Sequence, residues 1–248
     1  MQDTGIKESL RCYAKLLKLP TFSDLSEEKA KYKAGESLEE FVLRLMKREY
    51  DARQEKQRQR RIKRAHFPIL KTLEEFDMGR LEHVRPEYVK QLASCDFIRR
   101  HENLVMIGNP RTGKTHLMTA LGLKACLPGY KVLFKNATTL AAELREARDN
   151  YQQLRKMEKA IAGTDLLLLG ELSYASFTQE ESELLFKVIA ERTERTSTVI
   201  TTNLRFSRWT EVFSNDTLVV ALVDCLTYHS SILNMNGTSY RLQSQIKD

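Results

Sequence analysis

The sequence predicts an α/β fold: a central parallel sheet flanked by helices, preceded by a small all-helical N-terminal domain. Short apolar runs alternate with helical patterns between residues 104 and 203, which is typical of parallel strands joined by helices. A glycine-rich loop connects one of these runs to the helix that follows it. Residues 1–66 instead show helical periodicity, and they carry +6 of the chain's net charge of +7.

Length and composition limit the classes of protein to consider. The 248 residues suffice for one α/β domain and a smaller second domain, without disulfides or metals. No apolar run reaches the roughly 18 residues that span a bilayer, and the N-terminus lacks the apolar segment of a secretory signal. The four cysteines have neither metal-ligand nor redox spacing. We therefore expect a cytoplasmic protein with reduced cysteines and no membrane association.

Basic charge is concentrated at the end of a predicted N-terminal helix. Ser37 and Glu40 match a capping box, and apolar residues follow at helical spacing. Nine basic residues come next, against three acidic ones: Lys47, Arg48, Arg53, Lys56, Arg58, Arg60, Arg61, Lys63 and Arg64. Such a cluster can bind nucleic-acid phosphates, but it can equally be a solvated linker helix held by charge pairs. We place the domain boundary between residues 65 and 66, just before Pro68 breaks the helix.

Residues 108–115 form a phosphate-binding loop of the G-x-x-x-x-G-K-T type, between an apolar run and a helical pattern. Gly108 and Gly113 allow tight turns, and successive N–H groups form an anion nest at the helix start. Lys114 would reach the β- and γ-phosphates of ATP, and Thr115 would hold Mg²⁺. The predicted ATP-binding residues are Gly108, Asn109, Pro110, Arg111, Thr112, Gly113, Lys114, Thr115 and His116.

A second apolar run, residues 166–169, follows Asp165 and would carry the hydrolytic acids at its end. The usual ending is Asp-Glu, in which Asp anchors Mg²⁺ through water and Glu orients the attacking water. Here Gly170 takes the place of the Asp and Glu171 remains. Asp165 lies about 16 Å back along an extended strand, too far to substitute. A third run ends at Asn203, which either senses the γ-phosphate or is simply the polar end of a strand.

A long helical pattern, residues 138–160, lies between the phosphate loop and the acidic strand. It carries several basic residues, including Arg145 and Arg148, as well as acids. This pattern indicates either a DNA-contacting helix or an ordinary solvated helix face.

These motifs together resemble the IstB-like helper ATPases of insertion sequences. That family is related to the helicase loader DnaC and the initiator DnaA within the AAA+ superfamily. The resemblance covers nearly the whole chain. Beyond the phosphate loop it rests on residues 16–21, residues 66–77, Ser207-Arg208-Trp209, and Gly237-Thr238-Ser239-Tyr240-Arg241.

The resemblance implies an AAA+ ATPase domain at residues 66–248 and a helical domain at residues 1–65 that contacts DNA, a transposase, or both. It implies a homo-oligomer, ring or helical, that assembles on double-stranded DNA and assists a cognate transposase in target-site selection. ATP and Mg²⁺ would be the cofactors, with Mg²⁺ held by Thr115 and, through water, by Glu171. The catalytic set would be Lys114, Glu171, Asn203 and Arg241, the last as a γ-phosphate sensor. The helix from Thr138 would face the central channel, which favours DNA contact by Arg145 and Arg148.

Two departures from the family pattern bear on hydrolysis. Gly170 replaces the acidic residue of Asp-Glu-Leu-Gly-Tyr, and Cys225 replaces the arginine of Leu-Asp-Arg-Leu, the candidate finger for a neighbouring subunit's nucleotide. Arg205 or Arg208 could substitute in part. We therefore expect slow ATP hydrolysis. The alternatives are a hydrolysis-poor module that binds ATP and DNA, and a replicative helicase loader.

Overall fold

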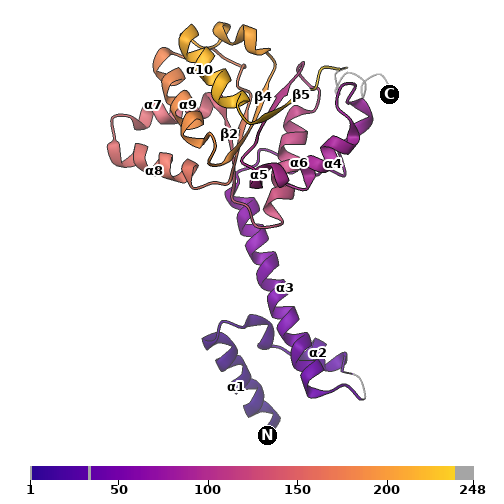
Figure 1. The fold of residues 1–248 in the computed structure, drawn as a ribbon. Coiled ribbons are helices and arrows are strands. Elements are labelled where there is room, and N and C mark those ends of the chain that lie inside the picture. The colour runs from indigo at the N-terminus through magenta and orange to yellow at the C-terminus, as the bar shows by residue number, and fades with distance from the viewer. Residues whose placement is uncertain (1, 33–34, 238–248) are drawn as a thin grey trace, which may run out of the picture. The chain divides into compact units, whose positions relative to one another are not determined.

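The computed structural model describes residues 2–32 and 35–237. The chain divides into two compact units, Met1–Arg60 and Arg61–Asp248 (Figure 1). The division falls within one long helix, α3 (Leu38–Arg64), so the last turn of α3 belongs to the second unit. Each unit is described separately below.

The N-terminal unit contains α1 (Gln2–Leu16), η1 (Pro20–Phe22), α2 (Ser26–Ala30) and most of α3. Two buried carboxylates connect its helices. Glu28 of α2 pairs with Arg44 of α3, with 2.9 Å between Nε and Oε2. Glu49 of α3 accepts hydrogen bonds from the Thr21 N–H at 3.1 Å and from Arg53 Nε at 2.7 Å. Burial raises the pKa of Glu49, but hydrogen bonds from the Thr21 hydroxyl, from Arg53 and from the Thr21 N–H outweigh burial and hold the pKa below its ordinary value.

The C-terminal unit contains a five-stranded sheet in the order β2-β3-β4-β1-β5, and every adjacent pair is parallel. The strands are β1 (Asn103–Ile107), β2 (Val132–Asn136), β3 (Leu166–Gly170), β4 (Ser197–Thr202) and β5 (Ser230–Asn234). Strands β1, β3 and β4 are the apolar runs identified in the sequence. The predicted α/β fold with a parallel sheet flanked by helices is confirmed.

Helices cover both faces of this sheet (Figure 1). On one face lie α4 (Pro86–Ala93), α5 (Asp96–Arg99) and α6 (Lys114–Cys126), with Leu166 and Leu168 of β3 in the core beneath them. On the other lie α7 (Ala137–Ala147), α9 (Gln179–Arg192) and α10 (Asp216–Thr227), packed on Leu167 and Leu169. The side chains of β3 alternate between the two cores because successive strand residues point to opposite faces. Two short 3₁₀ helices complete the unit, η2 (Met78–Arg80) and η3 (Phe206–Glu211).

The helical pattern at residues 138–160 is two helices rather than one. Helix α7 ends at Ala147 and α8 (Tyr151–Ala162) begins after Asn150. The Asn150 side chain accepts a hydrogen bond from the Gln153 N–H at 3.1 Å, which caps the new helix. The sequence does not reveal the break between α7 and α8, because both helices continue the same apolar periodicity.

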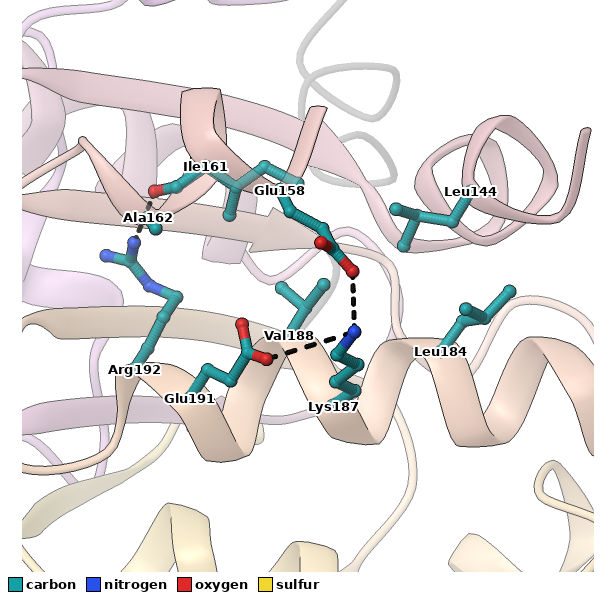
Figure 2. A pocket seen from close by; sticks show the side chains of 9 residues that line it. All are labelled: Leu144, Glu158, Ile161, Ala162, Leu184, Lys187, Val188, Glu191 and Arg192. Carbon is teal, nitrogen blue, oxygen red and sulfur yellow. Dashed lines mark hydrogen bonds and ion pairs between the residues drawn. The ribbon is translucent and has the colours of Figure 1, made fainter. Parts of the chain in front are cut away.

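Helix α9 holds α8 in place (Figure 2). Lys187 Nζ lies 2.7 Å from Glu158 Oε1, and Arg192 donates to the Ile161 carbonyl at 2.7 Å. The hollow between α7, α8 and α9 measures about 10 Å³, which leaves room for about one water molecule. This hollow is a packing defect and is too small for a ligand.

Arg192 is a buried guanidinium that connects α8 to the starts of two strands. It is 3% exposed and donates to Ile161 O, to Thr164 O and Oγ1, to Ser197 O at 2.9 Å, and to Thr198 Oγ1. Burial lowers its pKa to about 10, so the group stays charged at neutral pH. Its donors satisfy backbone carbonyls that would otherwise be buried without partners.

We expect Arg192→Leu to lower the free energy of unfolding by about 3 kcal/mol, because several buried acceptors lose their donor at once. The control is Arg195→Leu, an exposed arginine three residues along, which should change stability by less than about 0.5 kcal/mol. Urea unfolding monitored by circular dichroism measures both values. Equal effects of the two substitutions would contradict this role for Arg192.

Candidate nucleotide-binding site

A cavity of about 640 Å³ lies at the carboxyl ends of the parallel strands. Four parts of the chain line it: part of residues 68–81, the loop at 110–116, polar residues at or just beyond the ends of β3 and β4, and Gly237. Its volume suits a small-molecule ligand, and the carboxyl edge of the strands is where open α/β sheets bind ligands. The cavity therefore brings together most of the ATP-binding and catalytic residues predicted from the sequence.

The two glycines of the phosphate loop are required for different reasons. A Cβ on Gly108 would lie 2.5 Å from the carbonyl carbon and oxygen of Met235, so no side chain fits there. Gly113 has a φ of +90°, a left-handed conformation that glycine adopts without strain. The Gly108 N–H donates to Thr202 O at 3.2 Å, and the Asn109 N–H donates to Asn236 Oδ1 at 3.1 Å.

Lys114 is the first residue of α6 and is buried, with 7% of its surface exposed. Its Nζ donates to Gly108 O and Asn109 O, both at 2.6 Å. Burial lowers the pKa of Lys114 to about 8. No acid compensates its charge in these contacts, so a phosphate group in the loop would be a stronger acceptor than either carbonyl.

Glu171 directly follows β3 and takes a left-handed backbone conformation with φ of +61°. Its N–H donates to Thr201 Oγ1 at 3.0 Å, and its Oε2 accepts a hydrogen bond from Asn136 Nδ2 at 2.6 Å. Asn136 ends β2, and its Oδ1 caps α7 by accepting from the Thr138 N–H at 3.0 Å. Because the cap occupies the oxygen, the amide nitrogen is left to hold the carboxylate.

Asn136 was not among the site residues predicted from the sequence. Its one signal was an asparagine just before a helix, which is an ordinary capping pattern. The contact with Glu171 depends on β2 and β3 being neighbours in the sheet, where Asn136 pairs with Gly170.

Gly170 leaves no acidic group on the side of β3 that faces α6. A Cβ there would lie 3.2 Å from Phe134 Cζ and 3.4 Å from Met118 Cε, so apolar side chains occupy much of that space. Among the described residues no group of three or more His, Cys, Asp or Glu side chains can hold a metal ion. Thr115 is exposed at the start of α6 and Glu171 lines the same cavity. This set fits Mg²⁺ only if phosphate oxygens of the nucleotide supply some of the ligands of the ion.

The remaining catalytic candidates divide between the cavity and other places. Asn203 lines the cavity, and its N–H donates to Ser173 Oγ at 2.8 Å. Arg241 lies outside the described residues. Cys225 is half-buried on α10 and does not line the cavity. Of the two substitutes considered for its missing arginine, Arg208 pairs with Glu211, and Arg205 is exposed and does not line the cavity.

Several basic residues proposed as DNA contacts already have partners. Arg48, Arg53 and Arg58 pair with glutamates, and Arg61 donates to the Cys126 carbonyl at 2.9 Å. Arg145 pairs with Glu181 of α9 at 3.0 Å, and Arg148 pairs with Glu180. Within the described ranges no ion pair involves the exposed residues Lys47, Lys56, Arg60, Lys63 and Arg64 of α3, or Lys156 and Lys159 of α8.

A family model described as IstB-like ATP binding protein matches residues 12–248, which is nearly the whole chain. The chain belongs to the IstB-like ATP-binding family. A protein of insertion sequence IS21 from Pseudomonas aeruginosa, named for ATP binding, is 35% identical over 208 residues, covering 84% of this chain and 78% of its own length. Another, from insertion sequence IS5376 of Geobacillus stearothermophilus, is 32% identical over 242 residues, covering 97% of this chain and 96% of its own.

Solved structures show where this IstB-like fold recurs. DnaA from Aquifex aeolicus bound to AMPPCP superposes with a TM-score of 0.57 and 20% identity, over 73% of this chain and 56% of the DnaA chain. DnaI superposes with a TM-score of 0.56 and 15% identity, over 68% of this chain and 91% of the DnaI chain. These likenesses confirm the AAA+ fold expected from the motifs. In the described part of this chain, no helix combines the length and apolar character needed to cross a bilayer.

The depressed pKa of Lys114 predicts proton uptake when ATP binds. Phosphate stabilises the charged ammonium and raises its pKa above the value of about 8 in the free protein. We expect uptake of about 0.7 proton per ATP at pH 8.5 and almost none at pH 6.5, and apparent affinity should weaken as pH rises above 8.

Isothermal titration calorimetry in buffers of different ionisation enthalpy measures this uptake. Lys114→Arg is the matched control because a guanidinium remains charged at both pH values. Equal uptake by the unsubstituted protein at pH 6.5 and pH 8.5 would contradict the prediction.

Proposed function

We propose that this chain is an ATP-dependent DNA-binding ATPase that forms a homo-oligomer on double-stranded DNA and assists a cognate transposase in selecting target sites. The observation that carries the proposal is the phosphate loop. Gly113, the buried Lys114 and the start of α6 meet Glu171 and Asn203 around one cavity. Polar groups with these roles in one cavity are what ATP hydrolysis requires.

Each residue would have a separate role in hydrolysis. The loop N–H groups and Lys114 hold the phosphates, and Thr115 with Glu171 would hold Mg²⁺ beside them, where it neutralises phosphate charge. Glu171, fixed by Asn136 at 2.6 Å, orients the attacking water. Asn203 supports the γ-phosphate, and Arg241 takes the same role in our proposal on the strength of the family motif.

DNA binding is supported by the unpaired cations on α3 and α8. A lysine or arginine without an acidic partner can neutralise a phosphate without first breaking an ion pair, so we favour the unpaired residues over Arg145 and Arg148. The latter two would lose their pairs with Glu181 and Glu180. The names of the relatives, which come from insertion sequences, support a transposase as partner and weigh against a helicase loader.

A second candidate is a module that binds ATP and DNA but hydrolyses ATP poorly. Gly170 favours it, because an acid is absent and Phe134 and Met118 lie where its side chain would begin. Cys225 favours it as well, because a thiol cannot stabilise phosphate charge as an arginine does. In that case ATP would act by stabilising the assembled state.

We expect slow ATP turnover that double-stranded DNA accelerates, and DNA binding that requires ATP. A coupled phosphate-release assay and fluorescence anisotropy on the same preparation measure the two properties, with Lys114→Ala as the inactive control. ATP-dependent DNA binding without turnover would instead identify the hydrolysis-poor module. If the chain shows no ATP turnover and ATP does not change its DNA binding, the proposal is wrong.

The unpaired cations give a second test. We expect Lys56→Ala with Arg60→Ala to weaken DNA binding about tenfold and to reduce the slope of log affinity against log salt by about two, one for each lost phosphate contact. The control is Arg99→Ala with Arg100→Ala, two exposed arginines already paired with Asp96 and Glu102. A salt slope that is the same in both double variants would place the DNA contacts elsewhere.

A further inference from the structure

We propose that the side chain of Arg111, within the phosphate loop itself, is the arginine that stabilises the transition state of ATP hydrolysis in this chain. It would act in cis, on the nucleotide held by its own loop, and take over the role that Cys225 cannot perform. The inference rests on the proposed ATPase function and assigns one further catalytic residue to the same site.

The backbone at Arg111 is the first reason. Its φ is +65°, in the left-handed region that glycine occupies freely and other residues occupy at a cost. A glycine at this position would remove the strain and would leave the loop geometry unchanged. Strained positions of this kind concentrate at functional sites, so the strain points to a use for the side chain.

The surroundings of the side chain are the second reason. Arg111 is exposed and lines the 640 Å³ cavity, three residues before Lys114. No described residue forms an ion pair or a side-chain hydrogen bond with it. Among the described residues it is the arginine that lines this cavity.

The other basic residues that line the cavity have different surroundings. Lys114 is buried and donates to two carbonyls at 2.6 Å. His116 contacts the Thr72 carbonyl through Nε2 at 2.8 Å. Lys71 also lines the cavity, but it lies in the segment of Pro68 and Phe76 and is not part of the phosphate loop. Within the described part of the chain, Arg111 is therefore the unpaired guanidinium beside the phosphate loop.

The chemistry suits a guanidinium. Water attacks the γ-phosphorus, forming a P–O bond, while the bond from phosphorus to the β–γ bridging oxygen breaks and ADP leaves with the electron pair. One water proton passes through Glu171 to solvent. Charge shifts onto the bridging and γ-oxygens, and a planar, permanently charged fork can donate to two of them at once. An arginine in this role accelerates related NTPases by about 10³- to 10⁵-fold.

Arg111→Gly is the decisive variant because glycine keeps the backbone conformation and removes only the side chain. We expect its turnover number to fall at least about 100-fold, while its affinity for ATP changes less than threefold. Its affinity for ADP with aluminium fluoride and Mg²⁺, a mimic of the transition state, should fall in step with turnover. Arg111→Lys should recover part of the rate. Arg195→Ala replaces an exposed arginine just before the start of β4, at the end of the strands opposite the cavity, and should match the unsubstituted chain.

The outcomes separate this inference from the proposed function. If the unsubstituted chain neither binds nor hydrolyses ATP, both are wrong. If it hydrolyses ATP and Arg111→Gly does so equally fast, the ATPase proposal stands and this inference is wrong. A loss of ATP affinity equal to the loss of turnover would make Arg111 a binding residue and overturn the inference. ATP binding without any turnover would also overturn it, because Arg111 would then supply no catalytic charge.

Discussion

The site depends on backbone hydrogen bonds that fix the start of the phosphate loop between two neighbouring strands. Gly108 N–H donates to Thr202 O at the end of β4, and the Met235 N–H beyond β5 donates to Ile107 O at 2.6 Å. These bonds exist because β1 pairs in parallel with both strands. They bring Met235 so close that position 108 has room for no side chain.

The departure at Gly170 has a structural counterpart. At Gly170 the missing acid leaves space that Phe134 and Met118 partly fill. Beside it, the carboxylate of Glu171 is held by Asn136, whose other end caps α7. One side chain therefore contacts both the Glu171 carboxylate and the first turn of α7.

Charge serves two purposes in this chain. The buried Glu28 and Glu49 need arginines from α3 as partners, and Arg192 satisfies carbonyls at the start of two strands. Other cations on α3 and α8 stay exposed and unpaired in the described structure. A count of basic residues mixes these groups, although only the second can meet an external phosphate without breaking internal contacts.

The fold class and the phosphate loop were readable from residue order alone, because apolar runs, glycine spacing and the Lys-Thr pair are local patterns. The identity of Glu171 and Asn203 as strand-end residues was also local. The partners of individual charges were not, since Arg145 and Arg148 find their acids on α9, more than 30 residues away. The same holds for Asn136, which meets Glu171 through strand pairing, and for the strained backbone of Arg111. Contacts between distant residues depend on the tertiary arrangement, including the sheet order β2-β3-β4-β1-β5. No local periodicity encodes that arrangement.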